Sequence, residues 1–133
     1  MPLRRMELAA RRFPGVVVLS PAGRIGHDTA EAFRQALQPY LAACAAGEPA
    51  LVLDMERVEY ISSAGLRALL LAARQAKAQA GTLVVATLQP LVREVFEISR
   101  FTLLFRTFPS VREALAALSP EAVAAFEATR PRG

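Results

Sequence analysis

Ser62-Ser63-Ala64-Gly65-Leu66 is the stretch that decides the fold. It joins Leu51-Val52-Leu53, which is typical of a buried strand, to an apolar segment that predicts a helix from Leu66 towards Ala78. A serine at such a junction lies at the amino end of a helix, where unpaired backbone N–H groups and the helix dipole can accept a phosphate. We therefore interpret Ser63 as a reversible phosphorylation site and Ser62 as the helix cap. A cap alone does not need the small residues 63–65, which leave the helix start open to a partner.

Strand-like and helix-like segments alternate along the rest of the chain. The pattern predicts strands at 6–12, 16–19, 51–53, 82–86 and 103–105, with a hairpin turn at Pro14-Gly15. It predicts helices from Asp28 or Thr29 to Gly47, from Leu66, from Pro90, after Ser110 and from Ser119. Such alternation favours parallel strand pairing with right-handed crossovers. We expect one α/β domain: a mixed, mostly parallel sheet of four or five strands with helices packed against it. Its limits are predicted at 1–118, followed by a C-terminal helical extension at 119–133.

Composition limits the class of protein. The chain has 133 residues, of which 53% are hydrophobic, enough for one core. No apolar run reaches the ~18 residues of a membrane span. The apolar segment 8–10, flanked by arginines, is too short for a secretory signal. A single cysteine, Cys44, cannot form an internal disulfide or a zinc cluster. We expect a cytoplasmic protein that does not bind membranes.

The positive charge does not indicate a nucleic-acid-binding protein. The formal net charge is +4 and Lys77 is the only lysine, but the arginines are scattered and no tryptophan is present. A solvated surface is the better interpretation, because basic residues are not clustered with aromatic ones. The terminal arginines (4, 5, 130 and 132) are interpreted as tail features that could shape encounters with an acidic partner.

Residues 58–69, Val-Glu-Tyr-Ile-Ser-Ser-Ala-Gly-Leu-Arg-Ala-Leu, preceded by Leu51-Val52-Leu53-Asp54, resemble the signature of the STAS domain. Within that superfamily the segment is most similar to bacterial anti-sigma-factor antagonists. The likeness extends to Gly23-Arg24-Ile25, to 81–85 and to 92–101, and it covers roughly Leu8 to Leu118.

The resemblance implies a function in protein binding. In this family the serine that aligns with Ser63 is phosphorylated by the anti-sigma factor, an ATP-dependent serine kinase of the GHKL type. Unphosphorylated protein binds the anti-sigma factor, and phosphorylated protein releases it. A serine phosphatase is a further candidate partner, and a monomer or weak dimer is expected. The predicted partner-binding residues are Gly26, His27, Asp28, Ser62, Ser63, Ala64, Gly65, Leu66 and Arg67.

Two positions depart from the family pattern. Ser62 replaces the motif aspartate, and Gly26 replaces the acidic residue after the Gly-x-(Leu/Ile) turn. His27 and Asp28 follow Gly26, so Asp28 could take over the acidic role only if the loop shifts.

Two alternatives stay open at this point. One is a STAS subunit of another assembly, such as a lipid-transport ABC complex or a stress-signalling scaffold, in which Ser63 is not modified. The other is a small enzyme or nucleotide-binding protein of flavodoxin-like shape, in which His27 would activate Ser63 with Asp54 as orienting group. The chain lacks a Gly-x-Ser-x-Gly elbow and a phosphate-binding Gly-rich loop with lysine. Glu56 and Glu59 fall in a predicted loop and are expected to be solvated. We expect no enzyme activity, no catalytic residues, no metal and no cofactor.

Overall fold

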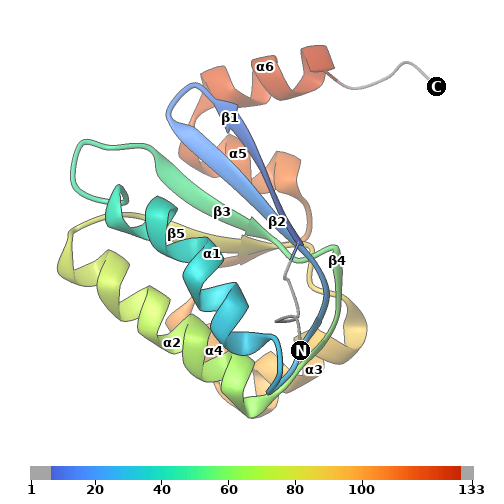
Figure 1. Cartoon of the computed structure of the whole chain (residues 1–133). Helices are drawn as coiled ribbons and strands as arrows, with labels where there is room; N and C mark the ends of the chain where they lie inside the picture. Colours follow the sequence, from blue (N-terminus) through green and yellow to red (C-terminus); the bar gives the residue numbers. More distant parts are fainter. Residues whose placement is uncertain (1–6, 130–133) are drawn as a thin grey trace.

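The computed structural model describes residues 7–129. Met6 and the terminal arginines 4, 5, 130 and 132 lie outside the described residues. A mixed β-sheet forms the middle layer, in the order β1-β2-β3-β5-β6, with β4 paired to the second half of β2 (Figure 1). Only the β1–β2 hairpin is antiparallel. The strands are β1 (Glu7–Phe13), β2 (Val16–Ile25), β3 (Ala50–Asp54), β4 (Arg57–Ile61), β5 (Leu83–Ala86) and β6 (Thr107–Phe108). The predicted mixed, mostly parallel α/β class is therefore confirmed, but the sheet of the described residues has six strands instead of four or five.

Helices cover both faces of this sheet. The helices are α1 (Ala30–Ala42), α2 (Ser63–Ala78), α3 (Pro90–Ile98), α4 (Phe101–Leu104), α5 (Val111–Leu118) and α6 (Pro120–Thr129). The larger core cluster contains Phe33 of α1 and Leu69 of α2, and α5 and α6 enclose the smaller cluster on the opposite face. Alternate residues of β2 serve the two cores: Val17 belongs to the first and Val18 to the second. No helix among residues 7–129 is long and apolar enough to cross a bilayer.

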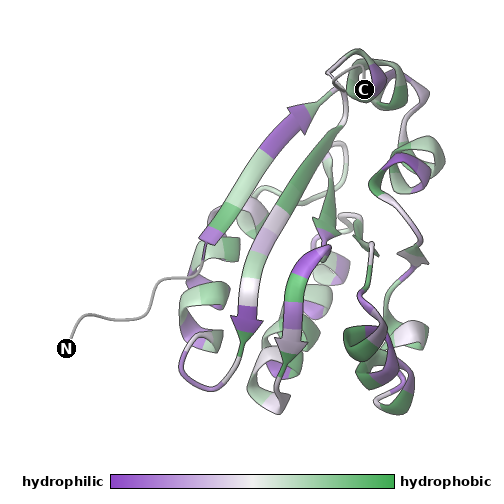
Figure 2. Cartoon of the chain, turned by 90° about the vertical axis from the view of Figure 1, so that its right-hand side faces the viewer, coloured by the Kyte–Doolittle hydropathy of each residue, from purple (hydrophilic) through white to green (hydrophobic). Residues whose placement is uncertain are grey.

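Strand β2 is longer than predicted, and β4 was missed. The apolar run ends at Leu19, but the strand continues through Pro21 and Gly23, changing from hydrophobic to hydrophilic along its length (Figure 2). Its second half pairs with β4, with a shift in register between Gly23 and Arg24. Strand β4 has only two buried residues, so its sequence shows almost no hydrophobic pattern from which a strand could be predicted. Glu59, predicted in a loop, lies in this strand with its side chain exposed.

Two other predicted segments are wrong. The predicted strand at 103–105 is replaced by the helical turn α4 and the short strand β6. The rings of Phe101 and Phe105 both pack on Phe96, with centroids 5.5 and 6.3 Å away, and a helical turn brings residues four apart to the same side. Helix α1 ends at Ala42, well before Gly47, because Cys44 turns into the core and is fully buried.

Candidate functional site

Ser62 caps helix α2, as predicted. Its hydroxyl accepts a hydrogen bond from the Gly65 N–H at 3.2 Å, and its carbonyl accepts one from the Leu66 N–H at 2.9 Å. Its own N–H donates to the Ile25 carbonyl at 2.8 Å, so the cap is tied to the end of β2. With 5% exposure, Ser62 is buried and shapes the helix start from beneath.

Ser63 is the first residue of α2 and is exposed. The next residue, Ala64, is half-buried. Within residues 7–129, the backbone N–H groups of Ser63 and Ala64 have no hydrogen-bond acceptor. The site therefore combines an accessible hydroxyl with unpaired N–H groups at the positive end of a sixteen-residue helix.

Gly65 allows α2 to rest directly on the ends of two strands. A Cβ atom at this position would lie 2.7 Å from Ile61 Cγ1, 2.8 Å from Ile25 Cγ2 and 3.0 Å from the Ile25 carbonyl oxygen. Real Cβ contacts are not this short, so any side chain would push the helix away from the sheet. The close approach positions the exposed serine relative to the loop that follows β2.

That loop, Gly26 to Asp28, is held beside the start of α2 because β2 and β4 end together, with Ile25 opposite Ile61. The hydroxyl of Thr29 accepts from the Gly26 N–H at 2.9 Å and donates to the Arg24 carbonyl at 2.8 Å. Thr29, one of the two residues predicted to begin this helix, is the N-cap residue of α1, but its side chain makes no capping bond. The hydroxyl fixes the loop instead, leaving His27 and Asp28 exposed.

A groove of about 340 Å³ runs between α1 and α2 from this point. His27, Ala64 and Arg67, all predicted partner-binding residues, line it. The other residues lining it, which the sequence analysis missed, are Ala30, Glu31, Arg34, Ala68 and Leu71. Leu71 is 41% exposed, and its place outside the buried stripe of α2 is a sequence signal that could have identified it.

The walls of the groove carry an ion pair on one side and an exposed arginine on the other. Arg34 Nη2 lies 2.6 Å from Glu31 Oε1, and this hydrogen bond holds the pKa of Glu31 below its usual value and raises the pKa of Arg34. Arg67, on the α2 side, makes no ion pair with the described residues. The groove therefore offers a small-residue floor, one apolar side chain at its end and one uncompensated cation.

The triad required by the enzyme hypothesis is not assembled. Asp54 lies at the end of β3 and accepts from the Ser20 hydroxyl at 3.4 Å and from the Glu56 N–H at 3.2 Å. It lines a cavity under α5 and α6, whereas His27 borders the groove on the other face of the sheet. Within residues 7–129, no three His, Cys, Asp or Glu side chains are grouped to hold a metal ion.

The chain belongs to the STAS domain family, whose model matches residues 7–114. A relative from Bordetella bronchiseptica, named "Putative anti-sigma factor antagonist BtrV", is 40% identical over 127 residues, which are 96% of this chain and 100% of the relative.

Solved structures agree with this assignment. The crystal structure of an anti-sigma factor antagonist from Mycobacterium paratuberculosis has a TM-score of 0.76 and 27% identity, covering 85% of this chain and 93% of its own. The phosphorylated form of SpoIIAA, a Bacillus cell fate determinant, shares the fold at a TM-score of 0.62 and 20% identity, over 86% of this chain and 99% of its own.

Proposed function

We propose that this protein is an anti-sigma-factor antagonist, a binding protein without enzyme activity that is switched by phosphorylation of Ser63. The observation that carries the proposal is the exposed serine at the first position of α2. It lies next to unpaired N–H groups and beside the loop 26–28, which the Thr29 hydroxyl fixes. The names of the relatives support the class of function. The partner is an anti-sigma factor that is also a serine kinase of the GHKL type, acting in the cytoplasm, and a serine phosphatase resets the switch.

The docking face consists of the loop 26–28, the exposed start of α2 and the groove between α1 and α2. Ser62 and Gly65 are buried and hold this face in shape, whereas His27, Ser63 and Arg67 are exposed and contact the partner. The relatives named anti-sigma factor antagonists support a partner of the anti-sigma-factor kind. The ATP site belongs to the partner, because the groove has no Gly-rich loop with lysine along it.

Phosphorylation acts by adding charge at a point where this protein tolerates it and the docked partner does not. A phosphoserine adds about −1.5 to −2 charges. The amino end of α2 stabilises negative charge by ~0.3–1 kcal/mol, so the fold survives. A partner surface complementary to a small neutral side chain would have to desolvate that charge, and an unpaired interface charge costs several kcal/mol.

The direct test is to incubate the protein with the GHKL-type kinase from the same genome and ATP, and to map the phosphopeptide by mass spectrometry. Wild type and Ser62→Ala should be modified at residue 63, and Ser63→Ala should not be modified. Phosphate on Ser62 or Thr29 in place of Ser63 would contradict the assignment. No modification, together with no binding, would instead favour a STAS subunit of another assembly.

A further inference from the structure

A second cavity, of about 400 Å³, lies on the face of the sheet opposite the groove. It lies at the carboxyl ends of β3 and β5, under helices α5 and α6, where α/β sheets commonly bind ligands. The residues lining it that matter here are Arg11, Asp54, Glu56, Thr87, Ser110 and Phe126. Its residues come from β1, the ends of two parallel strands and two helices.

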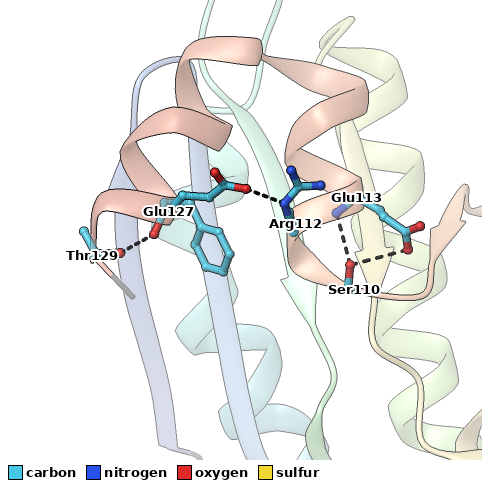
Figure 3. A network of polar contacts seen from close by, with 6 residues as sticks. Ser110, Arg112, Glu113, Glu127 and Thr129 are labelled. Atoms are coloured by element: carbon cyan, nitrogen blue, oxygen red, sulfur yellow. Dashed lines mark hydrogen bonds and ion pairs between the residues drawn. The ribbon is translucent and has the colours of Figure 1, made fainter. Parts of the chain in front are cut away.

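Helix α6 forms one wall, and it follows the residues that match the STAS family. Phe126 packs edge-on against Phe13 of β1, with ring centroids 5.8 Å apart. Glu127 of α6 and Arg112 of α5 point toward each other and form an ion pair (Figure 3). One wall of the cavity therefore comes from a helix that lies beyond the residues matched by the family model.

Several polar groups around this cavity already have partners. The Ser110 hydroxyl accepts from the Glu113 N–H at 3.1 Å, and the Thr129 hydroxyl donates to the Phe126 carbonyl at 2.7 Å (Figure 3). Arg112 is engaged with Glu127. These interactions hold together the two helices that form the wall, and the Nη groups of Arg112 have no partner among the described residues.

Arg11 is positioned but not hydrogen-bonded. Its guanidinium carbon lies 5.7 Å from the ring centre of Phe13 and 5.6 Å from that of Phe126, so two rings orient it. Among the described residues it makes no hydrogen bond or ion pair. A guanidinium held in this way presents a fork of N–H donors that matches a carboxylate.

The opposite end of the cavity carries negative charge without a cationic partner among the described residues. Asp54 is only 7% exposed, yet within residues 7–129 it has no cationic partner, and its two hydrogen bonds come from Ser20 and the Glu56 backbone. A buried carboxylate is costly unless it is paired or well hydrogen-bonded. The carboxylate of Glu56 adds a second negative charge at the same end.

Thr87 is the second unusual feature at this end. Its buried hydroxyl has no hydrogen-bond partner among the described residues, and its backbone has φ +62°, which is rare for a β-branched residue. An unsatisfied buried hydroxyl costs roughly 1–3 kcal/mol. Thr87 is one of the residues that line the cavity.

We propose that this cavity binds a small zwitterion, with its carboxylate on Arg11 and its ammonium on Asp54 and Glu56. An ammonium supplies the positive charge that this end lacks, together with three N–H donors. Arg11 pairs with Val18 and Val18 with Val52, so Asp54 lies two strands across and two residues along from Arg11, and their backbones are about 12 Å apart. Converging side chains then favour a ligand whose two charges are several ångströms apart, such as an ω-amino acid.

The test is a titration of the full chain, monitored by NMR of the backbone amides. The ligands are glycine, β-alanine, 4-aminobutyrate, 5-aminovalerate and 6-aminohexanoate, in which the distance between carboxylate and ammonium increases step by step. Butyrate and butylamine carry one charge each and are the matched controls. We expect saturable shifts at Thr87, Ser110 and Val111, with the best zwitterion binding at least about tenfold more tightly than either control, a factor equal to ~1.4 kcal/mol.

Two variants and one control assign the contacts. Arg11→Gln and Asp54→Asn should each weaken the binding of the best ligand by about tenfold or more. Arg12→Gln, on the next residue of β1 and therefore on its other face, should leave binding unchanged. If Asp54→Asn does not fold, the affinity of Arg11→Gln alone tests the proposal, because Arg11 is at an exposed strand position and its replacement should not prevent folding. The proposal is overturned if no member of the series binds saturably, or if a singly charged control binds as tightly as the best zwitterion. It is also overturned if Arg11→Gln leaves the affinity for that zwitterion unchanged.

Discussion

The two sites lie on opposite faces of one sheet and are built in opposite ways. The proposed docking face centres on six consecutive residues, 62–67, with the loop 26–28 and the groove between α1 and α2 beside them, and its hydroxyl and arginine are exposed above buried residues. The cavity under α6 takes its residues from β1, the ends of two parallel strands and two helices, and Arg11 lies against two rings that also pack on each other. A site centred on one exposed serine suits reversible modification by another protein, whereas charged groups gathered around a cavity suit a small molecule. The contrast predicts that each site can be damaged without the other.

The largest effect should come from charge at residue 63. Ser63→Asp is expected to weaken anti-sigma-factor binding by about 100-fold or more, because an unpaired interface charge costs several kcal/mol. Ser63→Ala should bind constitutively. Calorimetric titration measures both affinities, and circular dichroism should show that both variants fold like wild type.

Ser62→Asp is the matched control for that experiment. It adds the same charge one residue earlier, at the cap position, where aspartate caps a helix as well as serine does. Affinity should change much less than in Ser63→Asp. Equal losses in the two variants would mean that net charge, and not its position at residue 63, governs docking.

The support beneath the docking face can be tested through Gly65. Gly65→Val should destabilise the protein by about 1–3 kcal/mol, because its side chain would overlap Ile61 and Ile25. Ala64→Val, one residue earlier and half-buried, is the control and should change the melting temperature far less. If Gly65→Val had the melting temperature and the partner affinity of wild type, the close approach of α2 to the strands would contribute neither to stability nor to docking.

Much of the fold could be predicted from the sequence because its buried segments carry continuous apolar patterns. Strands β3 and β5 and helix α2 are of this kind. Strand β4 could not be predicted, since it is defined by its pairing with the second half of β2 and only Val58 and Ile61 are buried. The α4 turn was missed for a similar reason: three phenylalanine rings that pack together in space decide its conformation.

The same distinction applies to the sites. The capped helix start could be predicted because its residues are adjacent and the chemistry of a helix terminus is general. Leu71 and the Glu31–Arg34 pair were not predicted as site residues, because they line one groove only when α1 and α2 lie side by side. The residues of the second cavity are separated by more than a hundred positions, from Arg11 to Phe126, and no local pattern connects them.

The tail tests whether the two sites are independent. A chain ending at Leu118 loses α6, whose Val123 and Phe126 are half-buried, and should be about 1–2 kcal/mol less stable. It should also lose zwitterion binding, because one cavity wall is gone. Phosphorylation of Ser63 should continue at the wild-type rate. A folded, truncated protein that is no longer phosphorylated would place the tail in the recognition surface.

The smallest expected effect concerns Arg67, which lies one helical turn after Ser63 on the exposed side of α2. Residues four apart on a helix are neighbours, so a phosphate on Ser63 can pair with this guanidinium. Arg67→Ala should therefore lower the stability of the phosphorylated protein by about 0.3–0.5 kcal/mol more than that of the unphosphorylated protein. Denaturant titration of both forms measures the difference, and raising the salt concentration should shrink it, because exposed ion pairs are screened. Arg74→Ala, farther along the same helix and out of reach of the phosphate, should show no such difference. An Arg67→Ala variant that destabilises both forms equally would mean that Arg67 does not pair with the phosphate.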